Sequence, residues 1–134
     1  MINRAADIDV IFESCLEESI SVSFTSDEVQ EAIGKLHTNK APDIYGITAK
    51  HIIHGGHDLL LALTRTINEI CAARYVPDYI KMGILTPIFK NKGLPIDAKN
   101  YRGITVLPVI GKILEILLKK HIGKIIQSIQ SKFQ

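Results

Sequence analysis

The sequence predicts an α+β fold that is mostly helical and carries one long β-hairpin. Apolar residues recur at helical spacing in three stretches, near 25–36, 58–73 and 109–129. Two short runs rich in β-branched residues, 84–89 and 101–107, lie between the second and third stretches. With 134 residues, 46% of them hydrophobic, the chain can bury one core. We therefore expect one small domain.

Charge divides the chain into two unequal parts. Residues 1–33 hold one basic and eight acidic residues, a net charge of −7, whereas residues 34–134 hold fifteen basic and six acidic residues, a net charge of +9. Residues 1–23 show only weak helical periodicity, so we interpret them as an acidic lead-in or linker and place the domain at 24–134. A basic body is compatible with nucleic acid without being diagnostic of it. The acidic head is read as a solvated tail, with electrostatic masking of the basic body as the alternative.

Cysteine usage and hydropathy limit where the chain resides. Cys15 and Cys71 lie far apart behind no recognisable secretory leader, so we interpret them as reduced thiols. No apolar run approaches the roughly 18 residues of a membrane-spanning helix. We expect an intracellular protein, in the nucleus or the cytoplasm, without membrane association.

Thr25 begins the first predicted helix. Thr25 and Glu28 have the spacing of a capping box, in which each side chain accepts a backbone N–H of the other residue. Phe24 and Val29 occupy the two positions of a hydrophobic staple. The narrow apolar face of this helix consists of Val29, Ile33 and Leu36.

Two more helices are predicted before the hairpin. A short one covers residues 47–54 and is stopped by Gly55 and Gly56; the next runs from Asp58, its expected N-cap, to about Ala73. The core face of the longer helix consists of Leu60, Leu63, Ile67, Ile70 and Cys71.

Three histidines near this junction raise the question of zinc. His51 and His54 are spaced i, i+3 with His57 nearby, but the glycine pair turns His57 off the helical face, and no cysteine or fourth ligand is near. We interpret them as surface and helix-end residues, so no metal site is predicted.

The hairpin carries the residues of greatest functional interest. The first run, 84–89, has the composition of a half-buried strand, and about ten residues connect it to the second. Four basic residues gather there against the single acid Asp97, namely Lys90, Lys92, Lys99 and Arg102. Guanidinium and ammonium groups gathered in this way indicate a phosphate-bearing ligand. A solvated basic turn remains the alternative.

The last predicted helix follows Pro108, a residue suited to a first helical turn. Its apolar stripe consists of Val109, Ile110, Ile113, Leu114, Leu117 and Leu118, and it continues through Ile122, Ile125, Ile126 and Ile129. The second half of this stripe exceeds what so short a chain can cover. We therefore infer a partner surface that the chain itself does not supply.

Several sequence blocks follow one another in a recognisable order. They are Thr25 to Val29, Asn39 to Pro42 with Gly46 and Ile47, Pro87 to Gly93, Asn100 to Ile104, and Gly111 to Glu115. The last three fit the patterns P-I-x-K-x-x-G, N-Y-R-P/G-I and K-x-x-E. In this order and spacing they resemble the fingers region of the reverse transcriptases of LINE-type (non-long-terminal-repeat) retrotransposons.

Three positions depart from the family pattern. In K-A-P-G-x-D-G-I, Asp43 stands in place of the first glycine and Tyr45 in place of the aspartate. We expect the first change to strain the turn and the second to remove a polar anchor, as in a decayed copy or under relaxed selection. Ile80 stands where tryptophan is common, which preserves an apolar side chain of smaller area.

The resemblance implies the fold and the site residues of the parent enzyme. It implies a partial fingers subdomain of a right-hand polymerase, truncated before the palm, whose parent performs RNA-directed DNA synthesis with Mg²⁺ and deoxynucleoside triphosphates. Lys90 and Arg102 would contact the triphosphate of the incoming nucleotide. Lys92, Lys99 and Asn100 would support the hairpin or contact the template backbone.

No catalytic residue is predicted in this chain. The family's palm holds two Mg²⁺ ions with aspartates that include an adjacent pair, whereas the seven aspartates here include no Asp-Asp pair. We therefore expect the chain alone to bind no cofactor and to be inactive, with nucleic acid, nucleotide and a palm domain as partners. The alternative is a non-enzymatic helical interaction module with a basic surface hairpin.

Overall fold

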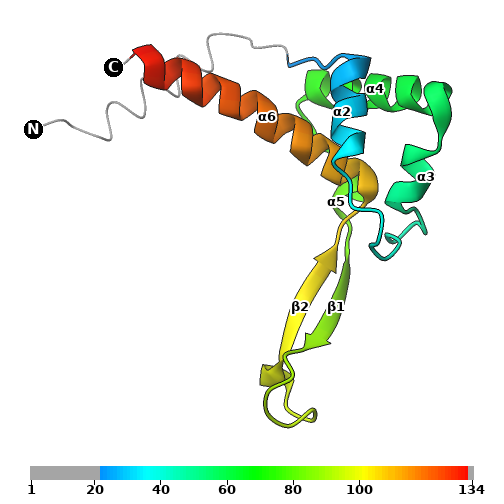
Figure 1. Cartoon of the computed structure of the whole chain (residues 1–134), viewed down its shortest axis with the longest axis vertical. Coiled ribbons are helices and arrows are strands. Elements are labelled where there is room, and N and C mark those ends of the chain that lie inside the picture. The colour runs from blue at the N-terminus through cyan, green and yellow to red at the C-terminus, as the bar shows by residue number, and fades with distance from the viewer. Residues whose placement is uncertain (1–21, 133–134) are drawn as a thin grey trace, which may run out of the picture.

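The structure is a computed structural model that describes residues 22–132, a helical body from which a β-hairpin projects (Figure 1). The elements in order are α2 (Ser26–Gly34), α3 (Ala49–Ile53), α4 (Gly56–Ala73), α5 (Asp78–Lys81), β1 (Ile84–Phe89), the 3-10 turn η1 (Ala98–Asn100), β2 (Tyr101–Val106) and α6 (Val109–Lys132). This confirms the α+β prediction. The predicted lead-in, residues 1–23, lies almost wholly outside the described residues.

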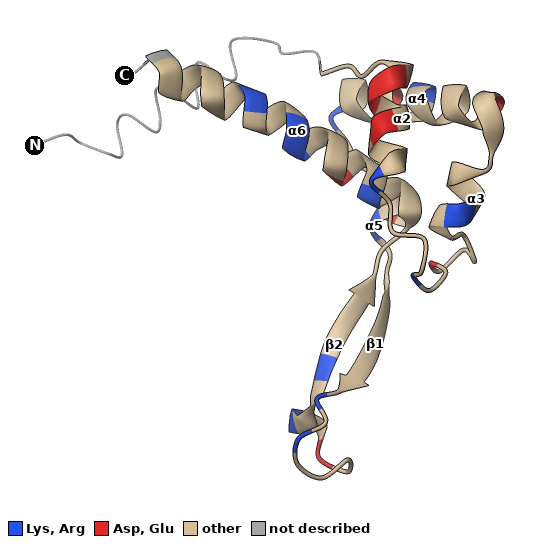
Figure 2. Ribbon diagram, in the orientation of Figure 1, with Lys and Arg blue, Asp and Glu red and all other residues tan. Residues whose placement is uncertain are grey.

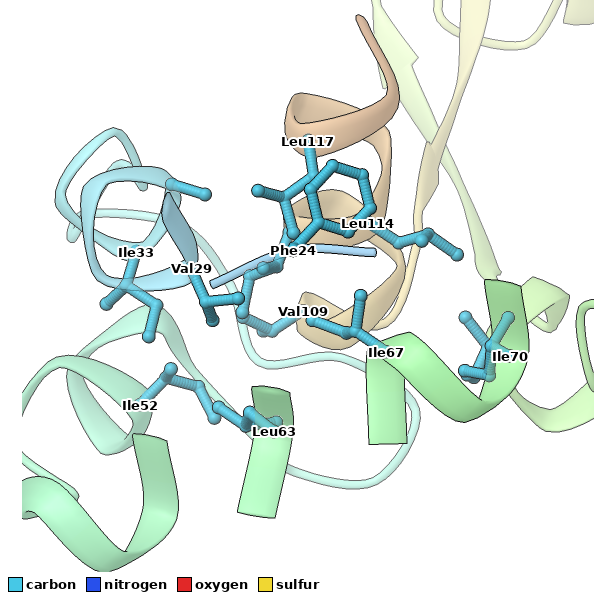
Figure 3. Close-up of a cluster of buried hydrophobic side chains, with 13 residues drawn as sticks. Phe24, Val29, Ile33, Ile52, Leu63, Ile67, Ile70, Val109, Leu114 and Leu117 are labelled. Carbon is cyan, nitrogen blue, oxygen red and sulfur yellow. The ribbon is translucent and has the colours of Figure 1, made fainter. Parts of the chain in front are cut away.

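One hydrophobic core joins α2, α4 and the first half of α6 (Figure 3). Its buried members come from the predicted apolar faces and include Val29, Ile67, Ile113 and Leu117, all almost fully enclosed. Ile80, at the position where the family has tryptophan, is buried as well. The periodicity of the sequence thus identified the faces that pack.

The start of α2 is bound to α4 by a side-chain amide. Thr25 and Glu28 form the predicted capping box, and Phe24 and Val29 are both buried. In addition, the Phe24 N–H donates to Asn68 Oδ1 (2.8 Å), and Asn68 Nδ2 donates to the Phe24 carbonyl (2.9 Å). These reciprocal bonds fix the direction in which the chain enters α2.

The boundary between α3 and α4 differs from the prediction. Gly55 is the N-cap of α4, and Asp58 lies within the first turn of that helix. Asp58 is therefore not the cap, although its charge still favours the positive end of the helix dipole. His51 has a local role, because its Nδ1 accepts the Thr48 N–H (3.1 Å) at the start of α3.

The hairpin is antiparallel and stands clear of the helices (Figure 1). The prediction of a half-buried strand is wrong: every residue of β1 except Phe89 is exposed, and so are the four central residues of β2. The apolar pattern is present, but among the described residues no second sheet or helix packs on β1 and β2, which form a two-stranded sheet by themselves. Pro87 opposes Gly103 outside the hydrogen-bonded pairs, so its missing N–H costs no ladder bond.

Asp43 joins the loop before α3 to the root of the hairpin. Asp43 is 4% exposed. Asp43 Oδ1 accepts the N–H groups of Tyr45 and Ile47 (both 2.9 Å), and Oδ2 accepts the N–H of Val109, the first residue of α6 (3.0 Å). One carboxylate therefore holds together segments 66 residues apart in the sequence.

The loop shows neither the backbone strain expected from Asp43 nor the loss of a polar anchor expected from Tyr45. The turn places Gly46 at positive φ (75°), while Asp43 is not among the non-glycine residues of positive φ in the described chain. Asp43 therefore does not strain the turn, and its carboxylate supplies the anchor that we expected to be lost. The Tyr45 hydroxyl adds a further bond, donated to the Tyr79 carbonyl (2.8 Å).

α6 is a single long helix whose last turns reach beyond α2 (Figure 1). Ile122 and Ile126 are 51% and 49% exposed, which confirms that the apolar stripe is uncovered at these two positions. Ion pairs to α2 hold the middle of the helix. Lys120 of α6 bonds to the Glu31 carboxylate, and so does Lys35 at the end of α2 (Lys35 Nζ to Glu31 Oε1, 3.1 Å). These two hydrogen bonds are the main reason that the pKa of Glu31 is lowered to about 2.

Candidate nucleic-acid interface

The connection between β1 and β2, residues 90–100, is held in a defined shape by its own hydrogen bonds and is called the knob. Asn100 Nδ2 donates to the Leu94 carbonyl (2.8 Å), and the Tyr101 hydroxyl donates to the Pro95 carbonyl (2.8 Å). Asp97 Oδ1 accepts the N–H of Lys99 (3.0 Å) and so caps η1. Three side chains thus bond to backbone groups of the same connection, which gives its backbone a defined shape.

Lys90 and Arg102 lie on one face of the hairpin but do not oppose each other. Arg102 pairs directly with Ile88, while the Lys90 N–H donates to the Asn100 carbonyl (2.7 Å) and continues the ladder. Ile88 and Lys90 are two residues apart, so their side chains project from the same face of the hairpin. Arg102 opposes Ile88 and therefore lies diagonally across from Lys90 on that face.

Lys90 and Arg102 also differ in the contacts that their charged groups make. The Lys90 ammonium donates to the Lys99 carbonyl (2.8 Å), so one of its hydrogen bonds is made within the knob. The Arg102 side chain is exposed and has no ion pair with any described residue. Arg102 is therefore the freer of the two for a ligand.

The three supporting residues of the prediction divide into two kinds. Asn100 is half-buried, contacts the Leu94 carbonyl, and packs so closely on Gly93 that a Cβ there would lie 2.5 Å from Asn100 Nδ2. It supports the hairpin directly. Lys92 and Lys99 are exposed near the tip, where Figure 2 shows positive charge gathered against a single acid.

A cleft of about 640 Å³ adjoins the hairpin face that carries Arg102. Its walls come from Ile88 and residues 104–106 of the hairpin, the first half of α6, and the segment from the end of α2 to the start of α3. Ile88, Ile104 and Ile116 contribute apolar surface, and the basic residues are Lys35, His37, Lys40, Lys112 and Lys119.

Two of these lysines are free of ion pairs within residues 22–132. Lys35 is paired with Glu31 and Lys119 with Glu115, whereas Lys40 and Lys112 have no acidic partner there. Neither was predicted from the sequence as a binding residue, because their proximity depends on the packing of α6 beside the loop after α2. Their only sequence signal is that each falls within a block of the family resemblance.

A second, apolar groove of about 450 Å³ lies on another side of α6. Val76, Ile80, Leu107, Leu114, Leu118 and Ile122 contribute to its lining. It is the surface on which the alternative reading, a helical interaction module, would depend.

Two further findings concern classes of site. Among residues 22–132, no group of three or more His, Cys, Asp or Glu side chains gathers as a metal-ligand set. Within the same range no helix has the length and apolar character needed to cross a bilayer.

Known proteins that resemble the chain are RNA-directed DNA polymerases of mobile elements. The chain is 32% identical over 98 residues to the polymerase from the mobile element jockey of Drosophila funebris, and 30% identical over 112 residues to that of Drosophila melanogaster. It is 32% identical over 104 residues to the probable polymerase from transposon X-element of Drosophila melanogaster. These matches cover 73%, 83% and 75% of the chain respectively but only 11–12% of each relative, so the chain spans about a tenth of their length. No protein-family model matches the chain.

Proposed function

Because the chain belongs, as one segment, to the RNA-directed DNA polymerases of LINE-type retrotransposons, we propose that it forms the part of the fingers that contacts the incoming nucleotide and the template. One observation carries this proposal: an exposed hairpin bears Lys90 and Arg102 on one face, and the cleft with Lys40 and Lys112 adjoins that face. The charged groups lie where a ligand can approach them, instead of facing acidic partners.

The hairpin residues suit a triphosphate. The Arg102 guanidinium presents paired N–H donors that match two oxygens of one phosphate group. The Lys90 ammonium has one N–H directed at the Lys99 carbonyl, which fixes its place while leaving two N–H groups for a second phosphate. Both groups hold and orient the nucleotide, and neither takes part in bond making.

The cleft suits a single strand of nucleic acid. Lys40 and Lys112 supply charge for the phosphates, while Ile88, Ile104 and Ile116 offer apolar surface to the faces of the bases. None of these contacts reads a base edge, so the strand would bind without marked sequence preference. This is the behaviour that a polymerase requires toward its template.

Salt dependence tests the template assignment. Replacing Lys40 or Lys112 with alanine is expected to weaken the binding of single-stranded RNA. The negative slope of log K against log salt should become shallower by about 0.7 for each phosphate that the protein no longer neutralises. Filter-binding titrations over a range of salt concentrations measure both quantities. Arg65→Ala is the control, because Arg65 is exposed on α4 and does not line the cleft.

Two results would count against the assignment. Equal slopes for all four proteins would show that these lysines contact no phosphate. Association that salt barely affects would favour the interaction module, because docking through the apolar groove releases few counterions.

The chain on its own is expected not to polymerise. Two-metal nucleotide transfer needs a set of carboxylates, and no set of three or more potential ligands gathers in residues 22–132. Primer extension with Mg²⁺ or Mn²⁺ and a heat-treated control measures this directly. Reproducible template-dependent incorporation would defeat the expectation.

A further inference from the structure

The tip of the hairpin presents apolar side chains to solvent. Leu94 and Ile96 are 71% and 93% exposed, and Pro95 between them is exposed too. They occupy the end of the hairpin that lies farthest from the helical body (Figure 1). Single exposed leucines or isoleucines are common on protein surfaces, but a contiguous apolar group at the end of a projecting element indicates contact with something else.

The surrounding bonds give this tip a defined shape. The Leu94 carbonyl accepts both Asn100 Nδ2 (2.8 Å) and the Asp97 N–H (3.2 Å), and the Tyr101 hydroxyl donates to the Pro95 carbonyl (2.8 Å). The Tyr101 ring in turn packs against Phe89, with 5.4 Å between the ring centroids. The carbonyls of Leu94 and Pro95 are thus bonded within the hairpin, while the side chains of Leu94 and Ile96 remain exposed at its surface.

The charge beside the tip favours one kind of partner. Lys90, Lys92 and Lys99 lie in the same connection, and Asp97, its single acid, bonds to the Lys99 N–H (Figure 2). An apolar point flanked by lysines complements a nucleic acid, in which phosphates surround the stacked faces of bases. Minor-groove proteins that kink duplexes insert such apolar side chains between base steps and partly unstack the bases.

We propose that Leu94 and Ile96 form a wedge that packs against the terminal base pair of a duplex at the point where its strands separate. The lysines of the connection hold the phosphates on either side of that point. This proposal rests on the proposed function, since a template strand in the adjoining cleft would bring the duplex ahead of it toward the tip. The wedge goes beyond nucleotide and template contact, because its role is to open paired template.

A forked substrate tests the wedge in the full chain. The probes are a short RNA–DNA duplex whose two strands continue at one end as non-complementary single strands, carrying 2-aminopurine beside the fork, and the RNA strand alone. We expect the chain to bind the fork roughly fivefold more tightly than the single strand, as for a base packed on a side chain, and to raise the fluorescence as the probe unstacks. The double variant Leu94→Ala/Ile96→Ala should lose both effects and keep its affinity for the single strand.

Controls separate the wedge from general apolar loss. Leu61→Ala/Ile126→Ala removes two similarly large side chains that are about half exposed on α4 and α6, away from the hairpin, and should behave as the unaltered chain. Because Leu94 and Ile96 bury little, thermal melts should match those of the unaltered chain. A Leu94→Ala/Ile96→Ala protein that still prefers the fork would overturn the wedge.

Other outcomes decide between partners and between proposals. Binding to phosphatidylserine vesicles that depends on Leu94 and Ile96, without fork preference, would overturn the wedge in favour of a lipid surface. Loss of fork preference in the control variant would overturn it as well. If the wedge fails while Lys40→Ala and Lys112→Ala still lower the salt slope, the proposed function stands; if no nucleic acid binds at low salt, both fail.

Discussion

Replacing Asp43 with alanine is expected to lower the free energy of unfolding by about 3 kcal/mol or more. The buried carboxylate accepts three backbone N–H groups, and its removal leaves those of Tyr45, Ile47 and Val109 without their acceptor. Each bond to a charged group contributes on the order of 1.5–3 kcal/mol, and the separate contributions do not add fully because the loop relaxes. Urea denaturation followed by circular dichroism measures the change.

Two further variants make this prediction specific. Asp43→Asn keeps the shape of the side chain but replaces one acceptor oxygen with a donor, so it should fall between the unaltered chain and the alanine variant. Asp78→Ala removes an exposed carboxylate whose ion-pair partner among residues 22–132 is Lys81, itself exposed, and should cost less than about 1 kcal/mol. If Asp43→Ala proves no more damaging than Asp78→Ala, then Asp43 does not hold the loop to α6.

Replacing Arg102 with alanine is expected to weaken the binding of a deoxynucleoside triphosphate roughly tenfold or more. Arg102 is exposed on β2 and has no ion pair among the described residues, so the effect should fall on the ligand and not on the fold. Arg102→Lys should be less severe, because it keeps the charge but not the paired donors. Calorimetric titration at low salt gives the affinities, and thermal melts confirm folding.

Lys99→Ala is the matched control in the hairpin. It removes an exposed ammonium, but the Lys99 group that receives Lys90 is the backbone carbonyl, which alanine retains. Lys90→Ala is less informative, because it removes both a candidate phosphate contact and a bond within the knob. The assignment would be contradicted by equal triphosphate affinities for the unaltered chain, Arg102→Ala and Lys99→Ala, or by no binding to any of them. Either result would show that the basic residues of the hairpin are solvated and that Arg102 holds no triphosphate.

Local chemistry made most of the fold predictable. The Thr25–Glu28 capping box fixes the start of α2, and the apolar positions of α4 and α6 are the ones that the core buries. Such features depend on residues within one or two turns of each other, and the sequence displays them directly. The predicted hairpin is confirmed, but the prediction that its strands are half-buried is wrong, because burial depends on what packs against a strand and not on the strand itself.

The parts that sequence reasoning missed depend on contacts between distant segments. In the sequence Asp43 is only a departure from a family pattern, whereas in the structure its carboxylate also accepts the Val109 N–H, 66 residues away. Lys40 and Lys112 share a cleft only because α6 packs beside the loop that follows α2. The diagonal placement of Lys90 and Arg102 likewise follows from the strand register, which the sequence alone did not fix.

Photocrosslinking tests most directly the central claim that the hairpin and the adjoining cleft bind nucleic acid. A single-stranded RNA containing 4-thiouridine is irradiated with the full chain at low salt, and the linked peptides are identified by mass spectrometry. We expect crosslinks in the hairpin and in the first half of α6, between Ile88 and Ile116, that heparin competes away. Crosslinks confined to α4, or to the exposed α6 surface around Ile122 and Ile126, would contradict the claim.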